Sequence, residues 1–128
     1  MTAGLADTTI FIAHESGRPL AAARLPDEIG VSVVTIGELR AGVLVATDVE
    51  SRDRRLDTLT RALALDPIPI DGAVADAWAR LRVLLRDDGR RMPVNDSWIA
   101  ATAIAHEIPV VTQNADYVDA PGLAVIHV

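Results

Sequence analysis

The sequence predicts an α/β fold: a three-layer α/β/α sandwich in which helices cover both faces of a short, mostly parallel sheet. Apolar runs of strand length alternate along the chain with longer stretches of helical periodicity, which is typical of this class. Half of the residues are hydrophobic, yet only four side chains are Phe, Trp or Tyr. A core built from Ala, Val, Leu and Ile suits helices packed on parallel strands. The length of 128 residues suits one domain, so we expect a single domain over residues 1–128.

Strands are expected where short runs of apolar or β-branched residues lie between turn residues. The runs that meet this description are residues 4–7, 31–34, 68–70, 110–111 and 123–128. The run at 68–70 is kept short by its prolines, because proline cannot donate a hydrogen bond to a sheet.

Helices are expected between these runs, from helical periodicity and from capping residues. They cover residues 8–14, 19–25, 35–46, 51–63, 72–87 and 95–106. The stretch 72–87 has the clearest amphipathic pattern. Ser51 is expected to cap the helix that it begins. The last helix is nearly all small or apolar, and we expect it to be buried.

The composition excludes several kinds of site. Cysteine is absent, which rules out disulfides and zinc–thiolate centres, and three scattered histidines argue against a zinc site. The formal net charge is −6 and all twelve basic residues are arginine. Bulk attraction to nucleic acid is therefore not expected, although arginines can cluster locally. The sequence shows no secretory signal and no apolar stretch of membrane-spanning length, so the expected location is the cytoplasm.

Four carboxylates lie where apolar runs end and a helix or loop begins. They are Asp7, Glu38, Asp96 and Asp116. In a parallel α/β sheet such positions meet at one edge, where ligands bind. Two carboxylates about 4 Å apart repel by roughly 4 kcal/mol at an effective dielectric near 20, and a divalent cation offsets that repulsion. The four acids together predict a magnesium or manganese site.

Each acid also has an ordinary structural explanation. Asp7 can cap a helix, Thr35 and Glu38 fit a capping box, Asp96 can complement a helix dipole, and Asp116 can be a turn residue. Capping and metal binding are compatible, because a helix N-terminus also fixes a carboxylate or receives a phosphate. The shared position of the four acids at the ends of apolar segments favours a joint site.

Four segments resemble the motifs of PIN-domain ribonucleases, and in particular those of VapC-type toxins. They occur in the family's order and span nearly the whole chain, at residues 5–13, 32–42, 95–103 and 110–117. The resemblance implies a PIN-like fold and a metal-dependent endoribonuclease that uses Mg²⁺, with Mn²⁺ as a substitute. It also implies the toxin of a toxin–antitoxin pair, which acts on RNA, forms a homodimer and is neutralised by a cognate antitoxin.

The resemblance also implies roles for individual residues. The acids that correspond to the catalytic and metal-binding residues are Asp7, Glu38, Asp96 and Asp116. Asp7 and Asp96 are expected to be the direct ligands, and the other two to hold waters or orient the nucleophile. Thr8 and Thr112 are expected to support these acids. The chain departs from the family pattern at Asn114, where many members have an acid, which leaves open whether Asn114 or Asp116 fills the fourth position.

Other interpretations remain open from the sequence. Arg90 and Arg91, in the loop before Asp96, are candidates for contacts to RNA phosphates, with a solvated loop as the alternative. The chain could be a non-toxin RNA-processing nuclease of the same family, or an inactive metal- or protein-binding module, for which Asn114 is the argument. A receiver domain is disfavoured because the chain has no lysine, and a phosphatase because an early Asp-x-Asp is absent.

Overall fold

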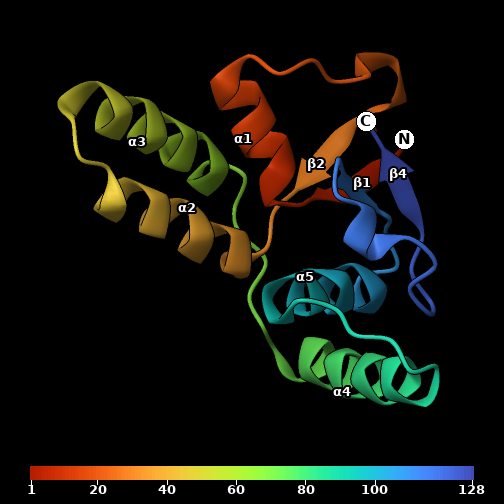
Figure 1. Ribbon diagram of the computed structural model, residues 1–128. Helices are drawn as coiled ribbons and strands as arrows, with labels where there is room; N and C mark the ends of the chain where they lie inside the picture. The colour runs from red at the N-terminus through yellow and green to blue at the C-terminus, as the bar shows by residue number, and fades with distance from the viewer.

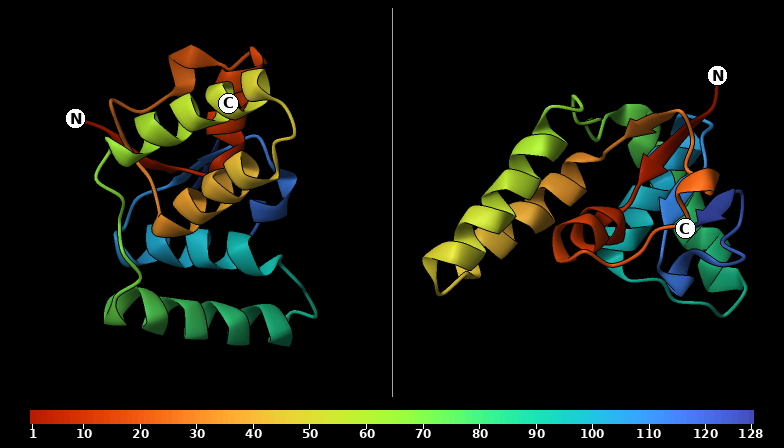
Figure 2. Two further views of the ribbon diagram at one scale, coloured as in Figure 1. Left: turned by 90° about the vertical axis from the view of Figure 1, so that its left-hand side faces the viewer. Right: turned by 90° about the horizontal axis from the view of Figure 1, so that it is seen from above.

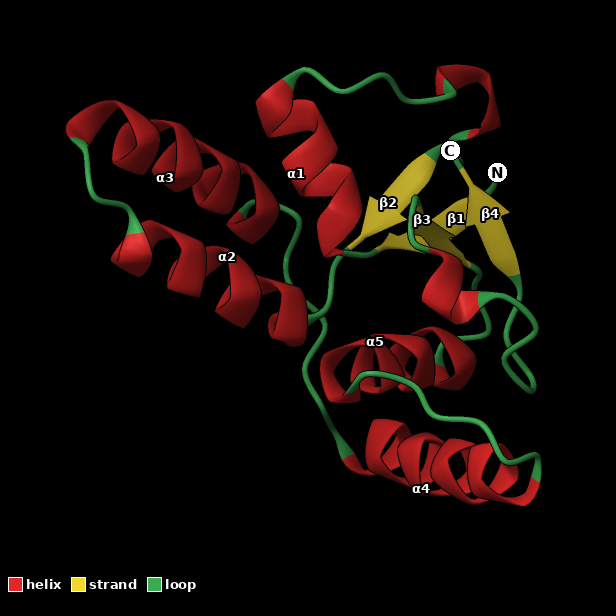
Figure 3. Ribbon diagram, viewed as in Figure 1, coloured by secondary structure: helices red, strands yellow, loops and turns green.

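The computed structural model describes residues 1–128 and contains a four-stranded, fully parallel sheet with the strand order β2-β1-β3-β4 (Figure 3). The strands are β1 (Ala3–Ala6), β2 (Glu28–Gly30), β3 (Val110–Thr112) and β4 (Val125–His127). The helices are α1 (Thr8–Ser16), α2 (Val33–Val45), α3 (Val49–Leu63), α4 (Gly72–Asp87) and α5 (Val94–Ala105), with short 3₁₀ turns η1 (Ala22–Arg24) and η2 (Ala115–Tyr117). The predicted α/β fold is confirmed.

The two faces of the sheet are covered by different helices (Figure 1). Leu5 and Val110 pair in register and share a buried cluster with residues of α4 and α5. Their neighbours Ala6 and Val111 belong to the opposite face, in a cluster with Ile10 of α1. Side chains alternate between faces along a strand, so each short strand contributes to both layers. Helix α4 lies outside α5, against which it packs (Figure 2).

Helices α2 and α3 form a hairpin that extends away from the sheet beside α1 (Figures 1 and 2). The two helices of the hairpin pack against each other through a small apolar cluster of Leu39, Val43, Leu59 and Ala62. Arg55 adds a polar link, since its guanidinium donates to the carbonyl of Gly42 at 2.7 Å. No helix of the structure is both long and apolar enough to cross a membrane.

The prediction of a strand over residues 31–34 is wrong. The strand β2 ends at Gly30, and Val33 already begins α2. Ser32 caps this helix, because its hydroxyl accepts from the amide of Val34 at 3.0 Å. The cost of a β-branched residue in a helix comes from crowding against the preceding turn. Val33 and Val34 lie in the first turn, where no turn precedes them, so their β-branched side chains are accommodated.

Four further local predictions differ from the structure. Asp48, rather than Ser51, caps α3, and it accepts from the amide of Ser51 at 2.8 Å. The capping box of Thr35 and Glu38 does not form, because the cap is Ser32. The helix over 19–25 is reduced to the single turn η1, and the extended segment at 68–70 to one bridge between Ser32 and Ile68. The helix over 72–87 and the buried helix after it are confirmed.

The strand order creates a topological switch point between β1 and β3. From β1 the chain crosses through α1 to β2 on one side, and later returns through α5 to β3 on the other side. The loops after β1 and β3 therefore diverge from adjacent strand ends, which is where open α/β sheets bind ligands. Asp7 follows β1 directly, and Thr112 ends β3.

Candidate functional site

Asp7 is buried at the switch point, with 2% of its surface exposed. One carboxylate oxygen accepts from the hydroxyl of Thr112 at 2.6 Å. The other accepts from both the amide and the hydroxyl of Thr9, at 3.1 and 2.5 Å. Burial raises the pKa of Asp7, and these hydrogen bonds oppose the rise. The three donors fix the orientation of the carboxylate between β3 and the start of α1.

Asp96 lies in the first turn of α5, and its two oxygens also accept hydrogen bonds. The phenol of Tyr117 donates to Oδ1 at 3.2 Å, and the amide of Asn114 donates to Oδ2 at 3.3 Å. Burial raises the pKa of Asp96 to about 6, with further contributions from the neighbouring Asp116 and from Asp7. Asp96 is thus close enough to Asp116 and Asp7 for their negative charges to raise its pKa.

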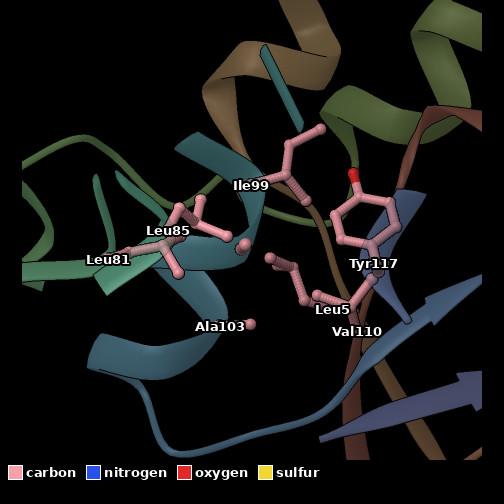
Figure 4. Close-up of a cluster of buried hydrophobic side chains, with 8 residues drawn as sticks. Leu5, Leu81, Leu85, Ile99, Ala103, Val110 and Tyr117 are labelled. Carbon is pink, nitrogen blue, oxygen red and sulfur yellow. The ribbon is translucent and has the colours of Figure 1, made fainter. Parts of the chain in front are cut away.

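Tyr117 connects the hydrophobic core with the acids. Its ring is fully buried among the apolar side chains of the core cluster, and its hydroxyl points away from them (Figure 4). Burial raises the pKa of this phenol above its ordinary value, and the charges of Asp7, Asp96 and Glu38 raise it further. Three acids from different elements therefore converge around one hydroxyl. Sequence reasoning missed this residue, although its position next to Asp116 was visible.

Glu38 reaches the site from α2 through a threonine of α1. The hydroxyl of Thr8 donates to Glu38 Oε1 at 2.7 Å and lies 3.1 Å from the hydroxyl of the buried Thr35. Thr8 therefore orients Glu38, while Thr9, which the sequence analysis did not single out, contacts Asp7. The two adjacent threonines thus serve two different acids.

The loop after β3 places Asn114 between two acids. Its amide group donates to Asp96, and its Oδ1 accepts from the backbone amide of Asp116 at 2.9 Å. The backbone amide of Asn114 itself donates to the Thr112 hydroxyl at 2.8 Å. Asp116 is exposed, so its carboxylate meets solvent at the rim of the site. The structure thus brings together all seven residues predicted for the acidic site, which are Asp7, Thr8, Glu38, Asp96, Thr112, Asn114 and Asp116.

The donor set fits a hydrated hard cation. Every side chain that could act as a ligand offers oxygen, which Mg²⁺ and Mn²⁺ prefer. No three His, Cys, Asp or Glu side chains stand close enough to enclose an ion by themselves. Magnesium does not need such a cage, because it keeps several waters and takes one or two carboxylates directly. The raised pKa of Asp96, caused in part by its acidic neighbours, is the repulsion that a cation would offset.

The pKa of Asp96 leads to a prediction for the metal-free protein. Because the pKa is about 6 in the folded state against a reference value of 3.8, the folded protein binds this proton more tightly than the unfolded chain. The stability gained in this way is fully present below the reference pKa of 3.8 and is lost as the pH rises through the folded-state pKa of about 6. From pH about 7.5 to about 5, the free energy of unfolding of the wild type should rise by about 1 kcal/mol more than that of Asp96→Asn, allowing for partial exposure. Urea titrations in EDTA measure this difference, and parallel pH profiles would contradict it.

The two arginines predicted to contact RNA lie beside the site but are held differently. Arg90 donates to the carbonyls of Val118 and Asp119, directly after η2. Arg91 is exposed. Both line a groove at the end of α4. Trp98 stacks on Trp78, with ring centroids 4.3 Å apart.

Comparison with known proteins assigns the family. The model of the PIN domain matches residues 5–123, so the chain belongs to the PIN-domain family. It is 44% identical to Ribonuclease VapC5 of Mycobacterium tuberculosis over 98% of this chain and 93% of that protein. It is 49% identical to Ribonuclease VapC4 of the same organism over 97% of this chain and 95% of that protein. The predicted membership among VapC-type ribonucleases is therefore confirmed, and the chain is an endoribonuclease of this type.

Solved structures agree with this assignment. The structure of VapBC-5 from Mycobacterium tuberculosis, a member of the VapBC family of toxin–antitoxin systems, matches with a TM-score of 0.91 and 40% identity over 100% of both chains. FitAcB from Neisseria gonorrhoeae matches with a TM-score of 0.76 and 28% identity over 95% of both chains. The short parallel sheet with its projecting helical hairpin is thus shared with a structure from a toxin–antitoxin system.

Proposed function

We propose that this chain, acting as a single nuclease domain over residues 1–128, is a toxin that cleaves RNA phosphodiesters at the acidic site. The observation that carries the proposal is the pair of carboxylates held at the switch point, Asp7 by the hydroxyl of Thr112 and Asp96 by Tyr117 and Asn114. The site would use Mg²⁺, with Mn²⁺ as a substitute. The test is in vitro cleavage of total RNA with and without magnesium, followed by sequencing of the new ends, which also identifies the target. A chain that leaves RNA intact under all metal conditions would refute it.

In this proposal Asp7 and Asp96 hold the ion. Both are fixed by neutral donors, Asp7 by Thr9 and Thr112 and Asp96 by Tyr117 and Asn114, so their negative charge stays available. Bound there, magnesium would lower the pKa of a water and neutralise the scissile phosphate.

The remaining two acids bind the attacking water and accept its proton. Glu38, oriented by Thr8, accepts the proton of the attacking water. Asp116, exposed at the rim, binds and orients water near Asp96. Attack of the water oxygen on phosphorus, in line with the leaving oxygen, then forms one P–O bond and breaks one P–O ester bond, and the leaving oxygen takes up a proton from solvent. Asn114 donates to the carboxylate of Asp96 and accepts from the backbone amide of Asp116, and Asp116 fills the fourth acidic position.

A magnesium titration tests the ion site independently of cleavage. At free magnesium about ten times its dissociation constant, linkage stabilises the fold by about 1.4 kcal/mol. The melting temperature of the wild type should rise accordingly, and that of Asp7→Asn/Asp96→Asn should not. Sodium chloride at matched ionic strength is the control, because an equal rise there would mean general screening instead of a site.

The cognate antitoxin is proposed to bind the helical hairpin beside the acids. This proposal is supported by the toxin–antitoxin complexes that the chain resembles and by apolar side chains that the fold leaves exposed. Leu44 and Val45 at the end of α2 are 71% and 70% exposed, and Leu56 and Leu63 of α3 also face solvent. A small cavity of about 280 Å³ lies between α1 and the hairpin and includes Glu38. An amphipathic segment on this surface would reach the site.

We also propose that the chain forms a homodimer and acts in the cytoplasm. Light scattering on the purified chain tests the oligomer. The alternatives of a processing nuclease and an inactive module are less well supported, because the relatives that cover nearly the whole chain are named VapC ribonucleases.

A further inference from the structure

An arginine-lined groove lies at the end of α4, outside the acidic cluster. Its volume is about 850 Å³, and it is formed by the last two turns of α4, the loop that follows and the first residue of α5. Four of its lining residues are Arg82, Arg86, Arg90 and Arg91. Arg82 and Arg86 are four residues apart and therefore share one face of the helix.

The charge of this region is opposite to that of the chain. Residues 82–91 contain four of the twelve arginines and two aspartates, which leaves +2, whereas the whole chain carries −6. One groove arginine, Arg86, pairs with the adjacent Asp87 at 3.3 Å, but both side chains are largely exposed, and such pairs are weak and easily exchanged. An anionic ligand would therefore meet a local positive field.

Two of the arginines are held in place by the fold. The guanidinium of Arg82 lies over the ring of Trp78, 5.0 Å from its centroid. Trp78 in turn stacks on Trp98 and donates through its indole nitrogen to Ser97 at 3.0 Å. Arg90 is anchored by its two bonds to backbone carbonyls after η2. Pre-positioned guanidinium groups lose less entropy on binding and suit the bidentate geometry of phosphate.

The groove adjoins the acidic site through two short links of chain. Val94, which lines the groove, is two residues before Asp96, a rise of about 3 Å along the helix. Val118, which accepts from Arg90, is two residues after Asp116, at most about 7 Å along the chain. A polymer in the groove is therefore within reach of the acids.

We propose that this groove binds the sugar–phosphate backbone of single-stranded RNA and guides the strand to the acidic site. The inference rests on the proposed ribonuclease function and adds the place where the substrate is held. The acids themselves repel a polyanion, and a chain of net charge −6 has no general attraction for it. The arginine groove supplies that attraction locally, next to the scissile bond.

The test compares two pairs of substitutions in the cleavage-deficient Asp7→Asn background, without metal. The groove pair is Arg86→Gln/Arg91→Gln. The control pair is Arg24→Gln/Arg80→Gln, which removes the same charge from exposed arginines outside the groove, one of them already paired with Asp76. Binding of a fluorescent oligouridylate of about 12 nucleotides is measured over a range of salt concentrations.

The groove pair should reduce the slope of log affinity against log salt by about 1.4, because each phosphate contact on a single strand contributes about 0.7. At about 0.1 M salt this corresponds to a roughly 25-fold loss of affinity. The control pair should stay within about twofold of the background. Equal slopes for the two pairs would overturn the inference.

Two parallel measurements keep the outcomes distinct. Cleavage of RNA by the unsubstituted chain in magnesium tests the proposed function, and absence of cleavage counts against that function. If the unsubstituted chain cleaves RNA but the groove pair binds RNA as tightly as the background, the result counts against the groove alone. An oligoglutamate peptide tests an acidic protein segment as occupant. If the peptide binding is lost in the groove pair while RNA binding is retained, the groove is a protein site and the RNA inference is overturned.

Discussion

Asp7→Asn and Asp96→Asn should each lower RNA cleavage by roughly a hundredfold or more while the protein remains folded. Loss of a metal-binding carboxylate removes several kcal/mol of charge stabilisation from the transition state, and each 1.4 kcal/mol corresponds to a factor of ten in rate. A neutral amide is a poor ligand for magnesium. The expected loss is therefore chemical, and its size separates these acids from residues that only support the fold.

Folding should survive because the neighbours of these two acids can adapt. In Asp7→Asn the amide nitrogen can face the hydroxyl of Thr112, which rotates to accept a hydrogen bond instead of donating one. In Asp96→Asn the substitution removes a like charge beside Asp116. Thermal melts in EDTA should therefore show equal or higher stability for Asp96→Asn than for the wild type.

The measurement is a cleavage assay with purified variants in magnesium, beside thermal melts of the same preparations. Asp57→Asn, an exposed acid on α3, is the matched control and should cleave like the wild type. Wild-type activity in Asp7→Asn or Asp96→Asn would remove that residue from the proposed site. A variant that loses activity together with its melting transition would point to a structural role instead.

The acidic site was predictable because its residues mark boundaries in the sequence. Asp7 and Thr112 lie at the ends of two apolar runs, and parallel strands bring such ends together. The structure places the hydroxyl oxygen of Thr112 2.6 Å from a carboxylate oxygen of Asp7, although 105 positions separate the two residues in the chain. Long, strongly periodic segments such as 72–87 were predictable for a similar reason, since helical spacing of apolar residues needs no tertiary information.

Other features depend on tertiary contacts that no local pattern encodes. Tyr117 supports Asp96 only because the loop after β3 packs against the start of α5, and the hydroxyl of Thr9 accepts from the amide of Gln113 only because α1 lies beside β3. The strand at 31–34 was predicted from β-branched residues, yet the Ser32 cap directs Val33 into a helix. The strands of this sheet are too short to show a clear alternation of apolar and polar residues. The helix-capping residues that follow them therefore decide where a strand ends.

The antitoxin surface gives the second large expected effect. Expression of the chain alone should arrest growth, because an unchecked ribonuclease destroys cellular RNA. Co-expression of its antitoxin, which we expect to be a small protein encoded beside it, should restore growth through a stable complex. An expressed chain that leaves growth and RNA intact, and never co-purifies with that partner, would leave the processing nuclease as the better assignment. Rescue without a complex would mean that the neighbour acts by another route.

Substitutions on the hairpin locate the contact. Arg54 is exposed on α3, so Arg54→Glu should repel an acidic antitoxin segment while leaving the acidic site unchanged. Arg55 is unsuitable for this test, because its guanidinium holds α3 to the Gly42 carbonyl of α2. Leu44→Ser should remove apolar contact area from the exposed end of α2.

We expect Arg54→Glu/Leu44→Ser to weaken the complex at least tenfold, which is about 1.4 kcal/mol, while RNA cleavage by the free chain changes by less than about twofold. Arg80→Glu, a charge reversal on the distant α4, is the control for both measurements, and equal affinities for the hairpin variant and this control would move the antitoxin site elsewhere on the molecule.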